Sequence, residues 1–135
     1  GGIESLLEDD AEHLPEKIDT DVKAHREYLE KGFAEPASSG LKDFEPFYEA
    51  QCAWEDGMAE AVAERRHAGP MVVIAGNGHI IYKFGIPDRA HARKAETFRT
   101  VYLIPAGESA ELDYADYIWA TPETGKPPMM GKMRR

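Results

Sequence analysis

The sequence predicts an α/β domain in which a helical N-terminal half precedes a small, largely parallel sheet with a crossover helix. Three observations predict it. Residues 1–66 show apolar residues at helical spacing, three short apolar runs rich in β-branched residues lie within residues 70–121, and a helix-forming segment separates the first two runs. A chain of 135 residues has room for one core, so we expect a single domain over residues 1–123 and a flexible tail over residues 124–135.

Two helices are expected in the N-terminal half. The first has Asp19 or Thr20 as its N-cap and carries apolar side chains at helical spacing as far as Phe33. The second begins near Asp43 and ends before Gly69, where glycine and proline stop it. Its expected apolar stripe consists of Phe44, Phe47, Tyr48, Trp54, Met58 and Val62.

Three strands are expected in the second half, at residues 71–76, 100–105 and 116–121, with a fourth if residues 79–83 also pair. Pro87 opens the helix that joins the first two strands, which is the connection typical of parallel sheets. Three strands with two long helices give a thin core. We therefore expect either that strands are missing from this chain or that a partner covers the sheet.

Composition excludes several classes of function. The net charge is −9, with −13 on residues 1–64 and +4 on residues 65–135, and no basic stripe favours a nucleic-acid partner. No apolar stretch approaches the roughly 20 residues of a transmembrane helix. The single cysteine, Cys52, excludes an internal disulfide and a cysteine zinc site.

The segment Gly-Asn-Gly-His at residues 76–79 follows the first expected strand directly. In open α/β sheets, ligands bind where loops leave the carboxyl ends of strands. Gly76 and Gly78 would permit positive φ angles and a close ligand, and His79 could serve as a base, a metal ligand or a haem ligand. Alternatively, Asn-Gly forms a hairpin turn and His79 begins another strand, which spacing alone slightly favours.

Other catalytic motifs are missing from the sequence. The residues after Gly76 match neither a phosphate loop nor a dinucleotide fingerprint, and the chain has no GxSxG or HExxH motif. Nucleotide binding, serine hydrolysis and zinc-protease chemistry are therefore not expected.

Several residues around His79 would suit a haem. Tyr82 offers a phenol within an apolar segment, and Arg89 and Arg93 share a helix face that could meet propionates. Tyr82 could equally be a packing residue of a strand. His25, His67 and His91 are expected at the surface.

Two polar residues lie along the second expected helix. Gln51 lies on its apolar stripe, where it could bond either to the neighbouring sheet or to a bound ligand. Glu55 is expected to be a boundary acid that reaches solvent rather than a catalytic one.

The sequence resembles the ChaN-like haem-binding proteins of the Tiki superfamily. The similarity lies in "FEPFYEAQCAWEDGMAEAVAE", "VVIAGNGHIIYKFGIPDRA" and "ADYIWATPE", and runs from Gly1 to Glu123. The family pattern includes Gln51, Trp54, the Gly-x-x-His ending at His79, and Gly85-Ile86-Pro87.

This resemblance implies haem binding linked to iron uptake at the bacterial envelope, in the periplasm or on an outer-membrane lipoprotein, by dimers that hold paired haems. It also implies a first half with its own Gly-Glu-x-His motif, so we expect this chain to be the C-terminal part of such a domain. The implied iron ligand is His79 or Tyr82, with Gln51 and Trp54 as a helical wall and Gly76, Gly78 and Arg89 completing the site. Without the first-half glutamate and histidine, catalysis is not expected.

Two alternatives remain open from the sequence. One is a hydrolase of the Tiki or erythromycin-esterase type, with His79 as base or metal ligand and Glu55 as the nearest carboxylate. The other is a non-catalytic self-association module whose sheet edge pairs with a second chain.

Overall fold

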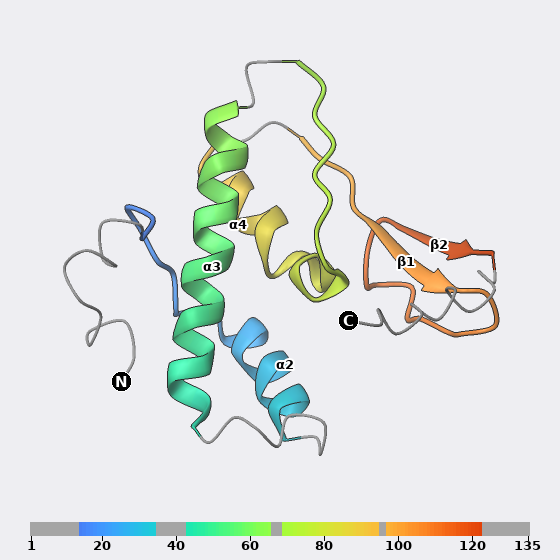
Figure 1. The fold of residues 1–135 in the computed structure, drawn as a ribbon, viewed down its shortest axis with the longest axis horizontal. Coiled ribbons are helices and arrows are strands. Elements are labelled where there is room, and N and C mark those ends of the chain that lie inside the picture. The colour runs from blue at the N-terminus through green and yellow to red at the C-terminus, as the bar shows by residue number, and fades with distance from the viewer. Residues whose placement is uncertain (1–13, 35–42, 66–68, 95–96, 123–135) are drawn as a thin grey trace, which may run out of the picture.

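The computed structural model describes residues 14–34, 43–65, 69–94 and 97–122 (Figure 1). The expected tail at 124–135, together with His13 and His67, lies outside these residues. The described part combines helices with a small parallel sheet, which confirms the α/β class. Its elements, in chain order, are α2 (Lys23–Phe33), α3 (Phe44–Arg65), η4 (Asn77–His79), η5 (Ile81–Lys83), α4 (Ile86–Ala92), β1 (Val101–Pro105) and β2 (Tyr117–Thr121).

Helix α3 forms the centre of the helical part, with α2 crossing its N-terminal half and α4 lying along its side (Figure 1). At the crossing, the ring of Phe33 in α2 packs against those of Phe44 and Phe47 in α3, at centroid distances of 5.5 and 5.4 Å. These three rings are partly buried, and their mutual contacts add apolar packing at the crossing. The second expected helix, from about Asp43 to before Gly69, is confirmed by α3, which spans Phe44–Arg65.

The expected N-cap of the first helix is wrong. Helix α2 begins at Lys23, and Val22 stands at its N-cap position without a side-chain capping bond. Asp19 and Thr20 are instead held against α3, because the Asp19 N–H donates to the Asp56 carboxylate at 2.8 Å and the Thr20 carbonyl accepts the Tyr48 hydroxyl at 3.0 Å. These bonds keep the chain extended until Val22.

The apolar stripe expected on α3 is only partly right. Tyr48 is buried, but the indole of Trp54 is 66% exposed. The buried face of the helix is made of small residues and carboxylates: Cys52, Ala53, Glu55, Asp56, Ala59 and Ala63 accompany Tyr48. Small side chains let α4 approach closely, and the carboxylates meet its arginines.

Strands β1 and β2 confirm two of the three expected strands. They run parallel, with Val101 opposite Tyr117 and Pro105 opposite Thr121. The sheet begins at a polar clamp, in which the Asp116 carboxylate accepts the Thr100 N–H at 2.8 Å and the Thr100 hydroxyl at 2.9 Å.

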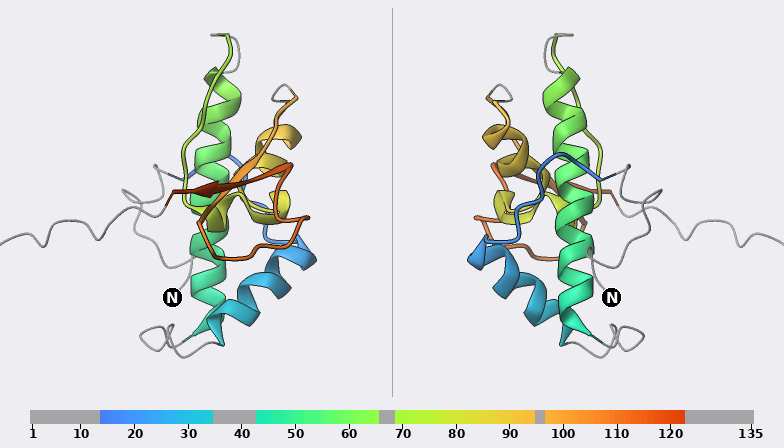
Figure 2. Two further views of the ribbon diagram at one scale, coloured as in Figure 1. Left: turned by 90° about the vertical axis from the view of Figure 1, so that its right-hand side faces the viewer. Right: turned by 90° about the vertical axis from the view of Figure 1, so that its left-hand side faces the viewer.

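The expected strand at residues 71–76 does not form a ladder. The segment runs extended beside α3 (Figure 2), and Val72 and Ile74 are 87% and 93% exposed. A strand needs a neighbour for its N–H and C=O groups, and the described residues place no strand directly against this one. Burial on both faces was therefore the wrong expectation.

Residues 79–83 form neither a fourth strand nor a hairpin. The chain turns through η4 and η5, with the His79 N–H donating to the Gly76 carbonyl at 2.9 Å. Tyr82 has a φ of 52°, a left-handed conformation that no strand contains.

Candidate functional site

The side chains of Gln51, Glu55 and His79 meet in a tight triangle between α3 and η4. Glu55 Oε1 accepts a hydrogen bond from Gln51 Nε2 at 2.8 Å and lies 3.1 Å from His79 Nδ1, and the Gln51 and His79 nitrogens are 3.0 Å apart. Gln51 and Glu55 are one helical turn apart, so they face the same side of α3. The triangle fixes the imidazole at its Nδ1 edge.

The second carboxylate oxygen of Glu55 faces the protein interior. It lies 3.4 Å from Nε2 of His25 and 3.5 Å from Nε of Arg89, and none of these three atoms has a hydrogen bond within the described residues. The Glu55 and His25 side chains are 0% and 1% exposed. Glu55 is therefore an interior residue shared by two histidines, and both surface expectations, for Glu55 and for His25, are wrong.

Burial shapes the protonation of this cluster. Loss of water raises the pKa of Glu55, and the hydrogen bonds from Gln51 and His79 oppose that rise. Burial, followed by the nearby charge of Arg89, lowers the pKa of His25 to about 4, so this imidazole is neutral at physiological pH.

Arg89 points into the interior and not toward a surface. Its guanidinium pairs with the Asp56 carboxylate and donates to the Asp19 carbonyl at 2.9 Å. Arg89 as a whole residue is 4% exposed. Arg93 adds a second ion pair to Asp56 at 2.7 Å. The two arginines share a helix face as expected, but that face meets buried carboxylates of α3.

The backbone around His79 is held by two features. The Asn77 carboxamide donates to the Leu103 carbonyl at 2.7 Å and accepts the Leu103 N–H at 3.4 Å. Gly85 lies behind the histidine, where an added Cβ would stand 2.5 Å from the His79 carbonyl oxygen and 2.9 Å from Glu55 Oε1. Only glycine allows η4 to approach α3 this closely.

Gly76 and Gly78 do not use the conformational freedom expected of them. Positive φ among the described glycines occurs at Gly69 and Gly107, and Gly76 has an extended φ of −62°. A Cβ at Gly78 would meet nothing within 4 Å.

Trp54 contacts His79, whereas the contacts of Tyr82 are made with other residues. The Trp54 ring stands edge-on to the imidazole at a centroid distance of 5.6 Å, and its exposed indole borders the partly exposed histidine. Tyr82 packs with Tyr28 and Tyr114 instead, and its hydroxyl donates to Glu111 at 3.1 Å. Partial burial and this bond raise the pKa of Tyr82 to about 12. The structure thus joins Gln51, Trp54 and His79, and it places Tyr82 in a separate aromatic cluster.

Among the members of this site, the sequence did not point to His25, and it pointed to Glu55 only as the nearest carboxylate of the alternative hydrolase and to Gly85 only as part of the family pattern. The signal for Glu55 was its spacing of four residues from Gln51 on the same helix face. Nothing local marked His25, because its partners come from α3 and α4.

Among the described residues, no group of three or more His, Cys, Asp or Glu side chains is arranged to bind a metal ion. Within the same residues, every helix is too short or too polar to cross a lipid bilayer.

Comparison with known protein families gives a match over the N-terminal two thirds of the chain. The model of a family described as haem-binding uptake, Tiki superfamily, ChaN, matches residues 1–90, a range that contains α2, α3, α4 and the Gln51, Glu55 and His79 triangle. The match stops before "ADYIWATPE", to which the sequence similarity had been expected to extend. No curated protein and no solved structure matches the chain. Because the family model covers two thirds of the chain, this protein belongs to the ChaN family of haem-binding uptake proteins in the Tiki superfamily.

Proposed function

We propose that this chain binds haem and that His79 is its iron ligand. The observation that carries the proposal is the contact between Nδ1 of His79 and the fully buried carboxylate of Glu55. A histidine that donates its Nδ1 proton to a carboxylate is fixed in one orientation and keeps the lone pair of Nε2 for a metal. This arrangement is typical of histidines that ligate metal ions.

Glu55 and Gln51 have complementary parts in this arrangement. Gln51 donates to the same oxygen of Glu55, which holds the carboxylate in place opposite the imidazole. An ionised Glu55 favours the tautomer with the proton on Nδ1, because the carboxylate can only accept. A haem bound at Nε2 would supply the iron, and the protein supplies an oriented and more basic imidazole.

Tyr82 is the less suitable of the two expected ligands. Iron is bound by the phenolate form of tyrosine, and a pKa of about 12 keeps Tyr82 protonated near neutral pH. Its hydroxyl is also engaged with Glu111. We therefore assign Tyr82 a packing role beside Tyr114.

The remaining expected site residues take more limited parts in the proposal. The exposed indole of Trp54 offers a flat apolar surface next to His79 for a macrocycle. Gly76 and Gly78 leave the approach to η4 uncrowded, since Gly78 has open space around it. Arg89 supports Glu55 from inside the protein and is not proposed to meet a propionate.

Hemin titration of the whole chain, followed by its Soret absorbance, tests the ligand. His79→Ala should lower hemin affinity by at least about tenfold and shift the Soret band, because the axial ligand is lost. Glu55→Gln should lower affinity by about 10- to 100-fold through the loss of the charged partner.

Two control variants make this test specific. His91 is an exposed histidine on α4, so His91→Ala should titrate like the unaltered protein. Tyr82→Phe should also leave the Soret band unchanged. An unaltered spectrum in His79→Ala together with a shifted one in Tyr82→Phe would reverse the ligand assignment.

The cellular setting proposed here is haem acquisition at the bacterial envelope. The family description as haem-binding uptake supports it. Fractionation of cells that produce the native protein tests it, and recovery in the cytoplasm alone would contradict it. Paired haems held between two copies of the chain would appear as a hemin-dependent doubling of molar mass in light scattering.

A histidine-assisted hydrolase is the second candidate function. The same Glu55 and His79 contact that orients a metal ligand also orients a general base. A panel of ester and peptide substrates would reveal it as turnover that disappears in His79→Ala and persists without hemin.

A further inference from the structure

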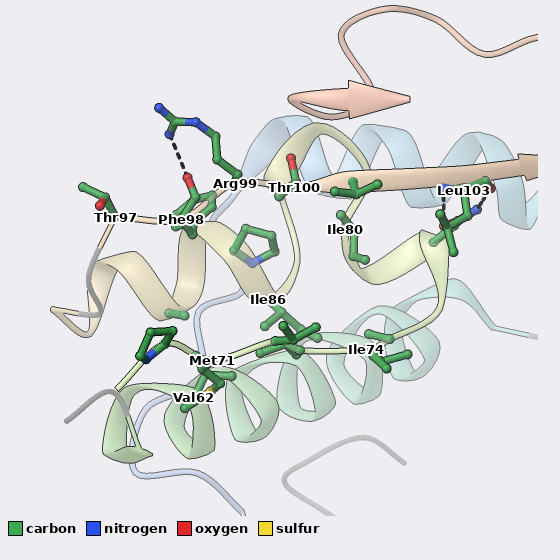
Figure 3. A pocket seen from close by; sticks show the side chains of 18 of the residues that line it. Val62, Met71, Ile74, Ile80, Ile86, Thr97, Phe98, Arg99, Thr100 and Leu103 are labelled. Carbon is green, nitrogen blue, oxygen red and sulfur yellow. Dashed lines mark hydrogen bonds between the residues drawn. The ribbon is translucent and has the colours of Figure 1, made fainter. Parts of the chain in front are cut away.

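An apolar groove separates residues 71–75 from strand β1. It has a volume of about 930 Å³ and opens to the surface between the two segments, which Figure 3 shows from close by. Val62, Ile80, Ile86 and Ala90 line it from the helical part. His79 does not line the groove, although its neighbours Asn77 and Ile80 do, and the lining contains no histidine, tyrosine or cysteine among the described residues.

One side of the groove is an extended segment with unused backbone groups. Residues 71–75 have no backbone hydrogen bond among the described residues, although their side chains are those of a strand. Met71 and Val73 are 40% and 44% exposed, and Val72 and Ile74 are exposed even more. Four consecutive apolar side chains left at a surface are costly unless something covers them.

The opposite side is the free edge of the sheet. The residues on either side of β1 bond to β2: the Thr100 carbonyl accepts the Tyr117 N–H, and the Ala106 N–H donates to the Thr121 carbonyl. Because the N–H and C=O of a residue in a parallel strand point to the same side, and sides alternate, those of Val101 and Leu103 point away from β2. These groups face the groove, whose lining includes both residues.

Asn77 shows what these backbone groups bind. Its carboxamide makes the paired N–H and C=O contacts with Leu103 that a peptide group of an adjacent strand would make. The contact occupies one end of the groove and is visible in Figure 3 beside Leu103. Val101 has no such partner among the described residues, so the ladder started at Leu103 is not continued along β1.

We propose that this groove binds an apolar β-strand of about five residues from a separate polypeptide, which pairs with Val101 of β1 on one side and with residues 71–75 on the other. A strand is the ligand that satisfies N–H and C=O groups on both sides while filling an apolar space. It would continue the existing β1 and β2 sheet across the groove. Uncharged, β-branched side chains suit it, because the residues that line the groove are mostly apolar.

Selection from phage-displayed random heptapeptides tests the proposal. The unaltered chain should enrich apolar, β-branched sequences, and Ile74→Lys should bind the selected peptides at least about tenfold more weakly, because a charge would then line the groove. Ile74 is 93% exposed, so the lysine does not disturb the fold. Leu112→Lys is the matched control, since Leu112 is 90% exposed but lies outside the groove, and it should bind normally.

Backbone N-methylation distinguishes a peptide that binds as a hydrogen-bonded strand from one that binds through its apolar side chains alone. A selected peptide with alternate N-methylated residues keeps its side chains but cannot donate hydrogen bonds along its methylated edge, and it should lose binding. The proposal would be overturned if the methylated peptide bound as tightly as the unmethylated one. It would also be overturned if the unaltered chain enriched apolar peptides no more than the Ile74→Lys variant did. Concentration-dependent dimers that Ile74→Lys abolishes would also overturn it, by showing that a second copy covers the groove.

The proposal stands independently of haem. His79 does not line the groove, so His79→Ala should retain the selected peptides whatever its effect on hemin.

Discussion

The carboxylate of Glu55 is fully buried between two histidines and an arginine. It lies within 3.5 Å of His25, His79 and Arg89 at once. Burying a carboxylate is costly unless other groups pair with it, and this one has both hydrogen bonds and a nearby guanidinium. Glu55 therefore connects His79, the candidate iron ligand, to the buried side chains of His25 and Arg89.

Gly85 is the residue whose replacement should disturb this arrangement most directly. In Gly85→Ala the new methyl group would lie 2.5 Å from the His79 carbonyl oxygen and 2.9 Å from Glu55 Oε1, so η4 must move away from α3. We expect a loss of about 1–3 kcal/mol in the free energy of unfolding, measured by urea denaturation, together with weaker hemin binding. Gly78→Ala, which meets nothing within 4 Å, is the control and should change little.

His25 should make stability depend on pH in a defined window. Its pKa is about 4 in the folded protein and 6.5 ordinarily, so between these values the unfolded chain binds more protons. Stability therefore falls as pH decreases from 6.5 to about 4, by up to about 3 kcal/mol at the acid end.

Denaturation at a series of pH values checks the contribution of His25. The fall in stability should be smaller in His25→Gln than in the unaltered protein, whereas His91→Gln should keep it in full. The comparison is needed because the raised pKa of Glu55 acts in the opposite direction, favouring the folded state when that group is protonated. Equal slopes in all three proteins would contradict a buried, neutral His25.

The length of helix α3 could be predicted from the sequence, but its buried face could not. Turn-forming residues and apolar spacing marked its ends. The face was misassigned because large side chains such as Trp54 were expected inside, whereas Ala59, Cys52 and Asp56 are buried there. Close contact with α4 and pairing with its arginines decide that choice, and both depend on residues about 30 positions away in the chain.

Arg89 is the residue of α4 on which this packing depends. Arg89→Met would leave Asp56 and Glu55 buried with less compensating charge, so we expect a loss of about 3–5 kcal/mol in the free energy of unfolding. Arg99→Met is the control, because Arg99 is exposed and its side chain bonds, within the described part of the chain, to the neighbouring Phe98 carbonyl alone. Asp56→Asn added to Arg89→Met should recover part of the loss; a double variant less stable than the single one would contradict this account.

The strands divide in a similar way. Apolar, β-branched composition located β1 and β2 to within a residue, and it also marked residues 71–76, which are extended but unpaired. Composition indicates that a segment can form a strand, but it does not indicate whether a neighbouring strand is present to bond to its backbone.

At the scale of the whole molecule, the helices and the sheet are joined by few but specific contacts. Lys83 pairs with Asp116 at 2.9 Å, the Tyr82 N–H donates to the Tyr114 carbonyl at 2.9 Å, and Asn77 bonds to Leu103. Lys83 and Thr100 together lower the pKa of Asp116 to about 2, so this link remains charged well into acid.

The fold class and the candidate ligand were accessible from the sequence because each has a local signature. Helical spacing, strand composition and the Gly-x-x-His ending at His79 all lie within short stretches. The interior cluster of Glu55, His25 and Arg89 was not accessible, since it joins α2, α3 and α4 and its members are polar residues that composition assigns to the surface.

The bond between Asn77 and Leu103 also bears on the chemical lifetime of the protein. Asn77 precedes Gly78, and an asparagine followed by glycine is the sequence most prone to deamidation, because no side chain hinders attack by the next backbone nitrogen. Conversion to aspartate would replace the amide that donates to the Leu103 carbonyl with a group that repels it. An aged sample would therefore lose the attachment of η4 to the sheet, and the helix presenting His79 would loosen with storage time.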